Sequence, residues 1–532
     1  MALSSAVDQA EPAFESISHE NAKQRFNFYN YLIILAVSCG TLATGMSNGV
    51  IGTTLGQPSF LNYFGFLQFT ATNTPLIGAI TGVFFAGAMF GCAFASYCNN
   101  RFGRKRALLI ANTINLVGIA LVAASVHIAM LLVFRTLSGF ASGMMISVTS
   151  VLQSELAPPH FRGLMVGVTG IMISCGYLIV NWLGLAFYFV EAGGAQWRVP
   201  IAICVFPNIV LYVLFAFPVI PESPRWLVNR GRRDEAKAVL VQLHGRNHAD
   251  AEQFANIELQ QIHEQIEFEK QHIQPWHAMF LKRKYWRRTV LTAVTMFMSQ
   301  SCGIIVIVSY GPAIYSSLGF NTVGQLAITA GYVTWSTLCA MVGTLIIDKV
   351  GRVRLMIIGT IVQIVLIAVV AALVARFAES TNKSALAATV AMFYIFASGF
   401  CLFVEGPAYT YICEIWPMHM RAQGTAVGIA SIYLIDIAFV EASLYAFAII
   451  GWRYYLVFVV CGTFFLIVFW ALAKETKNLS LEEIGVLFGE PLGTETLDNL
   501  IHHQNEKSTG AHYELVAQGG VAAKEAPKDQ SH

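Results

Sequence analysis

Three carboxylates, Glu405, Asp436 and Glu441, lie inside apolar runs that are long enough to cross a membrane. A charged side chain at the centre of a bilayer costs about 2.5–3.5 kcal/mol or more, so it usually faces a cavity or a partner. A carboxyl in such a place can bind and release a proton, or accept hydrogen bonds from a substrate. The alternative is that each acid pairs with a neighbouring basic or hydroxyl group, or lies near the membrane surface.

Helical spacing relates these acids to one another. Glu405 and Tyr409 are four residues apart, so they share a helix face. Asp436 and Glu441 are five apart, which turns them about 140° from each other at about 100° per residue. We therefore expect at most one of these two to face a central cavity squarely. Arg135 lies in another apolar run and also needs a partner.

A charged loop is written twice in the chain. Glu155 and Arg162 belong to the first Glu-x-x-Pro-x-x-x-Arg pattern, and Glu414 and Arg421 belong to the second. The offset is constant, since 414 − 155 and 421 − 162 are both 259. A constant offset over half the chain indicates an internal repeat, and parallel repeats are typical of transporters.

A second pair of matching sequences supports the internal repeat. Arg104 follows Gly103, and Arg352 follows Gly351, each after an apolar run. We expect the repeated charges to pair across the two halves and to hold one gate of a transporter closed. The alternative is that they only fix the topology of the loops.

Composition places the chain among polytopic membrane proteins. It is 56% apolar and only 12% charged, with a mean hydropathy of +0.59, whereas soluble domains carry about 25% charged residues. The ten cysteines are scattered and do not predict disulfides or a metal site. The sequence contains no Gly-x-x-x-x-Gly-Lys-Ser/Thr loop, no membrane histidine cluster and no basic, aromatic-interleaved patch. These observations argue against an enzyme, an ATP-driven pump and a nucleic-acid partner.

Apolar stretches of spanning length divide the chain into two sets of six. We predict an all-α membrane protein with a six-helix half at 28–219, a cytoplasmic helical connector at 220–288 and a second half at 289–473, flanked by tails at 1–27 and 474–532. The twelve predicted spans fall at 28–51, 76–98, 106–124, 128–153, 163–189, 199–219, 289–310, 326–347, 355–376, 388–413, 425–447 and 453–473.

Loop charges set the expected orientation. RFGRKR at 101–106 and DKVGRVR at 348–354 lie on the same side as the connector, while 52–75 and 311–325 contain no Lys or Arg. The positive-inside rule makes the first side cytoplasmic, together with both termini. Asn382 would then face outward within Asn-Lys-Ser, where it is either a glycan acceptor or an unused site.

These motifs together resemble the sugar porter family of the major facilitator superfamily, and the general style resembles its filamentous-fungal members. PESPRWLVNRGR at 221–232, with Glu222 and Arg225, nearly matches the family's Pro-Glu-Ser-Pro-Arg-Trp-Leu, and KETKNLSLEEI at 474–484 resembles its carboxyl-terminal motif. The likeness covers about 28–488. It implies alternating-access transport of a sugar or polyol, and it places Glu222 and Arg225 in the gating network.

The resemblance also implies substrate-binding positions, although several side chains differ from the family pattern. Asn181 stands where the family has a sugar-bonding Gln, and Tyr409 where it has a stacking Trp. Gln300 is retained, whereas Ser299 replaces a Gln and Ile305 replaces an Asn. We include Glu405 and Asp436 among the substrate-binding candidates because of their position inside the membrane.

Coupling is left open between two mechanisms. Ser47 stands where the family's proton symporters have an Asp, and Arg135, the usual partner of that Asp, remains. Serine does not titrate near neutral pH, so we favour a facilitator. The alternative is a proton symporter that uses Glu405 or Asp436, with Arg135 as a further coupling candidate.

Two other functions are also open. A less polar metabolite is an alternative substrate, because Ser299 and Ile305 make the cavity poorer in amides. A transporter-like nutrient sensor is a further alternative, which the short tail disfavours. We expect a small-molecule substrate and a lipid bilayer as partners, with protons open and no nucleic acid, cofactor or metal. We expect a monomer in the plasma membrane.

Overall fold

The structure is a computed structural model that describes residues 28–66, 73–157, 162–190, 192, 194–217, 219–244, 251–271, 277–377, 383–417, 420–477, 484–485 and 487–488. Within these residues it contains helices and no strand. Residues Phe26–Leu479 pack as one compact unit. Asn382, the predicted glycan acceptor, lies outside the described residues.

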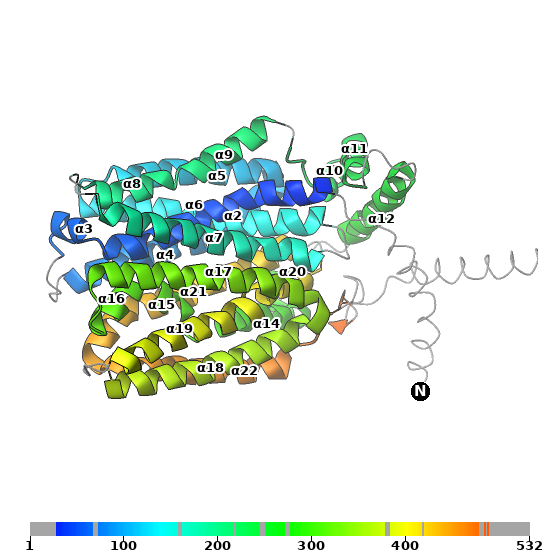
Figure 1. Cartoon of the computed structure of the whole chain (residues 1–532). Coiled ribbons are helices and arrows are strands. Elements are labelled where there is room, and N and C mark those ends of the chain that lie inside the picture. The colour runs from blue at the N-terminus through cyan, green and yellow to red at the C-terminus, as the bar shows by residue number, and fades with distance from the viewer. Residues whose placement is uncertain are drawn as a thin grey trace, which may run out of the picture. The chain divides into compact units, whose positions relative to one another are not determined.

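The first half is a bundle of six membrane-length segments, drawn from blue to green in Figure 1. The sixth segment is broken into two helices, and a short helix caps the loop after the first. In chain order the helices are α2 (Phe28–Leu55), α3 (Pro58–Tyr63), α4 (Asn73–Phe102), α5 (Arg104–Ala123), α6 (Ile128–Leu156), α7 (Arg162–Tyr188), α8 (Ala195–Ile203) and α9 (Phe206–Ala216).

Four helices then form the connector: α10 (Pro224–Asn229), α11 (Arg233–His244), α12 (Ala251–Gln271) and α13 (Ala278–Leu281). Leu227, Ala236, Leu240, Ala255 and Ile262 form a small apolar core of their own between α10, α11 and α12. These three helices lie at one end of the bundle (Figure 1), which we call the connector end.

The second half repeats the plan, with breaks in its first and fourth segments. Its helices are α14 (Arg283–Gln300), α15 (Ile304–Ser309), α16 (Gly311–Ser317), α17 (Thr322–Val350), α18 (Arg352–Phe377), α19 (Lys383–Phe403), α20 (Glu405–Glu414), α21 (Arg421–Ile450), the 3-10 turn η3 (Gly451–Arg453) and α22 (Tyr454–Leu472).

The number of spans agrees with the prediction. Ten segments of the described chain are long and apolar enough to cross a membrane, and the last, Arg421–Leu472, contains both α21 and α22. One further segment, α14 with α15, is interrupted after Gln300 and is not among the ten. Separating α22 and adding this segment gives twelve, so the predicted all-α membrane fold is confirmed.

Small residues allow the closest helix contact in the first half. A Cβ on Gly87 or Gly91 of α4 would lie 2.2 Å or 1.9 Å from carbonyl oxygens of α6. A Cβ on Gly139 or Gly143 of α6 would lie 2.0 Å from carbonyl oxygens of α4. Only glycine fits at these four positions, and the spacing of four on each helix is typical of tight helix pairs in membranes.

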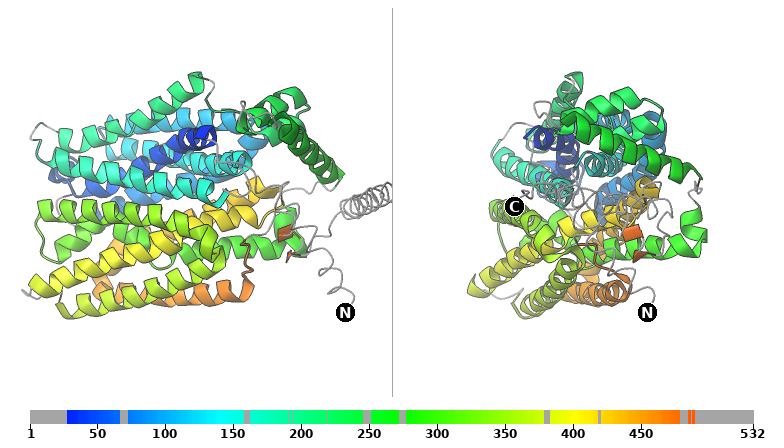
Figure 2. Two further views of the ribbon diagram at one scale, coloured as in Figure 1. Left: turned by 45° about the vertical axis from the view of Figure 1, so that its right-hand side comes forward. Right: turned by 90° about the vertical axis from the view of Figure 1, so that its right-hand side faces the viewer.

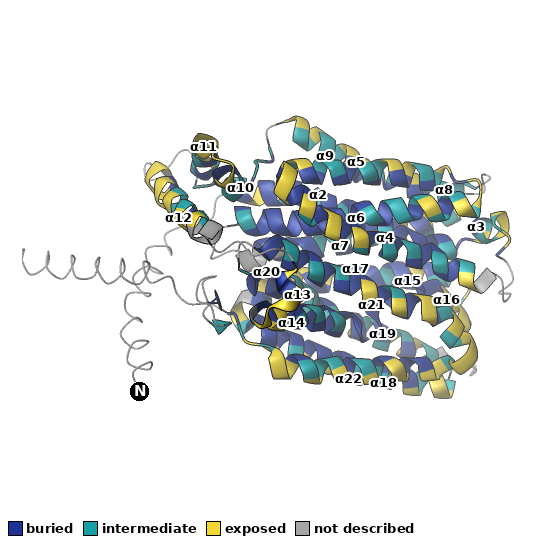
Figure 3. Ribbon diagram, turned by 180° about the vertical axis from the view of Figure 1, so that it is seen from behind, coloured by how far each residue is buried: buried dark blue, intermediate teal, exposed yellow. Residues whose placement is uncertain are grey.

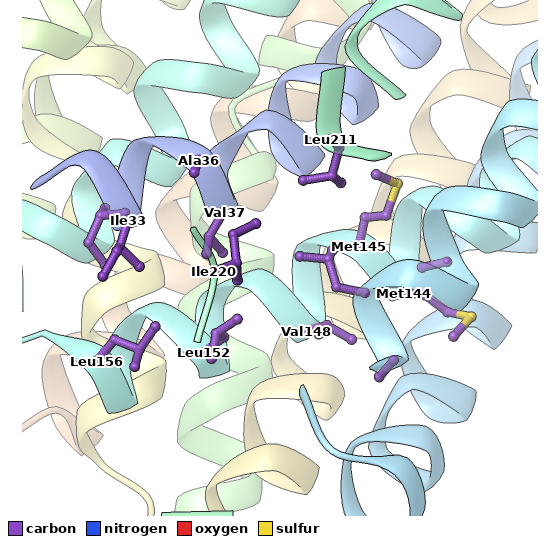
Figure 4. Close-up of a cluster of buried hydrophobic side chains, with 14 of the residues drawn as sticks. Ile33, Ala36, Val37, Met144, Met145, Val148, Leu152, Leu156, Leu211 and Ile220 are labelled. Atoms are coloured by element: carbon purple, nitrogen blue, oxygen red, sulfur yellow. The ribbon is translucent and has the colours of Figure 1, made fainter. Parts of the chain in front are cut away.

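Apolar side chains fill the space behind these contacts and cover the outside. Figure 4 shows Ile33 and Val37 of α2 packed with Val148 and Leu152 of α6 and with Ile220, which follows α9. Figure 3 shows the exposed residues on the outward faces of the helices. Large apolar side chains are among them, including Phe90, Val133 and Trp470, as expected of a surface that faces lipid.

The two halves meet chiefly along two helix pairs, α4 with α21 and α7 with α17. Figure 2 shows the blue-to-teal helices of the first half lying against the green-to-orange helices of the second. Trp182 of α7 donates its indole N–H to Thr334 of α17 at 2.9 Å. The rings of Phe85 and Tyr433 stack between α4 and α21 with centroids 6.0 Å apart. The central cavity therefore lies between two lines of direct contact.

Candidate functional site

A central cavity opens between the halves, with an empty volume of about 980 Å³ that includes the part open to solvent. The first half contributes side chains from α2, α6 and α7, and the second half from α14, α15, α17, α19, α20 and α21. Its wall mixes hydroxyl, amide and tyrosine groups with aliphatic ones. Such a wall can hold a small molecule that has both an apolar face and several hydroxyl groups.

Five of the predicted substrate-binding residues line this cavity: Ser299, Gln300, Glu405, Tyr409 and Asp436. They come from three helices of the second half, α14, α20 and α21. Gln300 is the last residue of α14, before Gly303 takes a φ of +81° and starts α15 in a new direction. Glu405 is the first residue of α20, after a break at Val404. Helix ends thus position two of the polar groups.

Asn181 does not line the cavity, which corrects our expectation for this residue. Its side-chain N–H donates to the carbonyl oxygen of Tyr177 in the same helix at 2.8 Å, and only 3% of the residue is exposed. Tyr177, one turn earlier on α7, lines the cavity instead. The sequence prediction was right for the helix and its face, but Asn181 lies one turn beyond the part of α7 that lines the cavity.

The two cavity acids have oxygens without a hydrogen-bond partner. Asp436 is 2% exposed, and its Oδ1 has no hydrogen-bond partner. Oε2 of Glu405 also has no hydrogen-bond partner. The third membrane acid, Glu441, lies elsewhere: its carboxylate is against Gly78 and Gly82 of α4, and it does not line the cavity. This agrees with the expectation that at most one of Asp436 and Glu441 faces the cavity.

Arg135 has backbone carbonyl groups as hydrogen-bond partners, in place of the Asp that the resemblance implies at the position of Ser47. Its guanidinium donates to the carbonyl oxygen of Ser47 and, at 3.4 Å, to that of Asn48. It also lies over the ring of Phe84, with 4.3 Å from its carbon Cζ to the ring centroid. Carbonyl dipoles and an aromatic face therefore stabilise a cation that is 2% exposed.

A charge cluster lies at the connector end of the first half. Arg104, the first residue of α5, donates from Nε and Nη2 to the two carboxylate oxygens of Glu155 at 2.9 Å and 2.8 Å. Glu222 accepts the backbone N–H of Arg104 at 2.9 Å and that of Lys105 at 3.2 Å. Arg225 also interacts electrostatically with Glu155. Burial raises the pKa of the Glu222 carboxyl, and the backbone N–H groups that it accepts oppose that rise.

The second half repeats this cluster. Arg352, the first residue of α18, donates to Glu414 at 3.1 Å, and the backbone N–H of Arg352 donates to Glu475 at 2.9 Å. The hydroxyl of Thr476 donates to the other oxygen of Glu414 at 2.7 Å. Glu475 was not among the residues predicted from the sequence, although KETKNLS and PESPRWL share a Glu followed by a hydroxyl residue, which could have indicated it.

The ion pairs of Arg104 and Arg352 lie within the halves, whereas we expected the repeated charges to pair across them. Arg104 pairs with Glu155 inside the first half, and Arg352 pairs with Glu414 inside the second. Arg421 is buried at the start of α21, 4% exposed. The side chain of Arg162 is outside the described part of the chain. The two ion pairs therefore brace α5 on α6 and α18 on α20, within each half.

Tyrosines are the functional candidates that sequence reasoning overlooked. Tyr177, Tyr332 and Tyr433 line the cavity beside Tyr409. Each comes from a different helix, so no motif within one segment could predict that these tyrosines lie together. Tyrosine offers an apolar face for a ring and a hydroxyl for hydrogen bonds.

Comparison with known proteins gives consistent results. Residues 32–488 match the family model described as Sugar (and other) transporter. The MFS-type transporter criB of Aspergillus cristatus is 31% identical over 465 residues, which cover 86% of this chain and 94% of that protein. A high-affinity glucose transporter of Kluyveromyces lactis is 26% identical, over 86% of this chain and 84% of its own length.

Solved structures share the fold. The proton:xylose symporter XylE bound to 6-bromo-6-deoxy-D-glucose superposes with a TM-score of 0.74 at 23% identity, covering 87% of this chain and 100% of that one. An inward-open structure of XylE from E. coli gives a TM-score of 0.66 at 22% identity, covering 86% of this chain and 99% of that one.

Proposed function

Because the chain belongs to the Sugar (and other) transporter family, and is a transporter of the major facilitator superfamily rather than an enzyme, we propose that it carries a sugar or polyol across a membrane by alternating access. The observation that carries this proposal is the cavity between the two halves, whose polar groups come from both of them. A substrate held by both halves couples its own passage to their relative movement.

The polar groups of the cavity support a hydroxylated substrate. Gln300 supplies an amide, Ser299 a hydroxyl, and Tyr177 and Tyr409 supply faces from opposite halves. A sugar needs both kinds of contact, since its ring edges are polar and its ring faces are apolar. The glucose transporters among the relatives are consistent with this choice.

A less polar substrate is the second candidate. Ile304, Ile305 and Val308 form one wall of the cavity, and Ile305 stands where the resemblance places an amide. An aliphatic wall favours a molecule with fewer hydroxyl groups than a hexose. The two candidates differ in which labelled compounds they would carry.

We also propose the setting of the protein. The charged loops and the connector lie at one end of the bundle, and the positive-inside rule supports a cytoplasmic location for that end and for both termini. The plasma membrane and a monomeric state complete the proposal. Antibody access to tags at each terminus in intact and permeabilised cells tests the orientation.

Counterflow in liposomes tests the transport proposal. Purified full-length protein would be reconstituted, loaded with unlabelled D-glucose, D-xylose or sorbitol, and given the labelled compound outside. Saturable counterflow of one of these supports the proposal, and its loss in Tyr409→Ala ties it to the cavity. Absence of counterflow for all three, with protein that elutes as a single species, would overturn the sugar proposal in favour of a less polar substrate.

A further inference from the structure

The cavity holds two acids and no described base. Asp436 and Glu405 line it, and none of the described lining residues is Lys, Arg or His. Oδ1 of Asp436 and Oε2 of Glu405 have no hydrogen-bond partner. Asp436 is 98% buried, being 2% exposed. A buried acid whose oxygen is aimed into a cavity without a partner is an incomplete site, since such groups are normally satisfied.

The nearby cation does not complete this site. Arg135 is committed to the carbonyl oxygens of Ser47 and Asn48 and to the face of Phe84, and it is not among the lining residues. The other charged or titratable groups that interact with the two acids are tyrosine and cysteine side chains. They are Tyr177 of α7, Tyr409 of α20, Tyr433 of α21 and, beside Glu405, Cys401 of α19, with Cys92 of α4 behind Tyr409 and Tyr433.

These neighbours are neutral near pH 7, since free Tyr and Cys titrate well above it. No fixed positive charge from the described lining residues therefore balances the two carboxylates in this cavity. A pair of ionised acids would carry a large cost once the cavity closes around a substrate. A proton on one of them lowers that cost, so closure around a neutral substrate favours a protonated acid.

Both acids belong to the second half, and both face α7 of the first half. Glu405 lies near Gly170, where a Cβ would be 3.6 Å from its Cγ, and Asp436 lines the same cavity as Tyr177. Separation of the halves removes α7 from the acids and admits water. The movement that releases a substrate therefore also hydrates the carboxyl and lets it ionise.

We propose that Asp436 is the proton carrier of a proton-coupled transporter, and that Glu405 is the second acid of the same site. Asp436 takes a proton from water on one side, forming one O–H bond, and returns it to water on the other side. This inference rests on the proposed sugar transport. It takes up the proton-symport alternative that the sequence left open beside a facilitator, and it assigns the carrier to α21 rather than to α2, where Ser47 stands.

A proton gradient across liposomes gives a direct test. A symporter that moves one proton with each sugar accumulates the sugar about tenfold for each pH unit, since both correspond to about 1.4 kcal/mol. The probes are labelled D-glucose, D-xylose and sorbitol, each measured in counterflow without a gradient and in gradient-driven uptake. We expect wild-type accumulation to collapse with a protonophore, and Asp436→Asn to lower accumulation by a much larger factor than it lowers counterflow.

Two further variants make the result specific. Glu405→Gln is expected to weaken accumulation less than Asp436→Asn, while Glu441→Gln, an acid on the same helix outside the cavity, keeps it. Elution of each variant as a single species in detergent shows that it is folded. Wild-type counterflow without accumulation would overturn the proton carrier and leave the sugar proposal standing. Equal loss of accumulation in Glu441→Gln and Asp436→Asn would overturn the assignment to Asp436.

Discussion

The carboxylate of Glu475 accepts the backbone N–H of Arg352 at 2.9 Å, where α18 begins. In the first half, Glu222 accepts the backbone N–H of Arg104 at the same distance, where α5 begins. The amino end of a helix carries partial positive charge and free N–H groups, so an anion is well placed there. The same arrangement, a carboxylate at the amino end of a helix, therefore occurs in each half.

Glycine is required beside both acids. Gly103 and Gly351 have φ of +91° and +111°, and an added Cβ would lie 2.4 Å from Glu222 and 2.9 Å from Glu475. We expect Gly103→Ala and Gly351→Ala each to lower the apparent melting temperature in detergent and to slow transport, because the acid must move off the helix end.

Gly231 provides the control for backbone strain alone. Its φ is +78°, but nothing lies within 4 Å of an added Cβ. Gly231→Ala should therefore show only the strain cost of about 1–3 kcal/mol, with transport preserved. Equal effects of all three variants would show that the contact with the acids is unimportant.

Charge reversal distinguishes pairing within a half from pairing across the halves. Breaking a buried ion pair costs about 3–5 kcal/mol, so Arg104→Glu and Glu155→Arg should each destabilise the protein strongly. Combining them should restore part of the lost melting temperature. Combining Arg104→Glu with Glu414→Arg should restore nothing, and recovery in that variant would favour the pairing across halves.

Gln300 and Asn181 should differ in their effect on substrate affinity. Gln300 lines the cavity, whereas the side-chain N–H of Asn181 bonds within its own helix. Loss of one substrate hydrogen bond costs about 0.5–1.5 kcal/mol, or roughly two- to tenfold in KM. We expect that increase for Gln300→Ala and a KM near wild type for Asn181→Ala, measured with the sugar that shows counterflow.

Arg135 should not tolerate replacement by lysine. A single ammonium group cannot reproduce the planar fork that reaches two carbonyl oxygens while it stacks on Phe84. Arg135→Lys should lower the apparent melting temperature, with a loss of about 1–2 kcal/mol. The matched control is Arg453, which is exposed and has its Cζ 5.9 Å from the ring centroid of Trp452. Arg453→Lys should leave the apparent melting temperature nearly unchanged.

Sequence patterns predicted more of the fold than of the site. Apolar runs and the constant loop offset predict the repeated helical plan, because each depends only on local composition. Tyr409 could be placed with Glu405 because both lie on one short helix. The partners of Arg135 could not be predicted, since they are backbone carbonyl groups, which every residue type has.

The pairing of the charged loops failed for a related reason. Arg104 and Glu155 are 51 residues apart in the chain, and only the packing of α5 on α6 brings them together. Equal motifs in two halves fit pairing within a half as well as pairing across them. Asn181 shows the limit for single residues. It shares a face of α7 with Tyr177, but Tyr177 lines the cavity, while Asn181 lies one turn further along the helix and bonds to its own backbone.

The break after Gln300 has a consequence for how the chain is made. The segment Arg283–Ser309 begins with several cations, among them Arg287 and Arg288, and is interrupted before Gly303, so neither α14 nor α15 is a convincing membrane anchor alone. In the finished protein α14 packs on α21 and α22, which are synthesised more than 120 residues later. Its stable insertion during biosynthesis should therefore wait for the last two spans, and a ribosome stalled before Arg421 would leave this segment accessible to water-soluble labels.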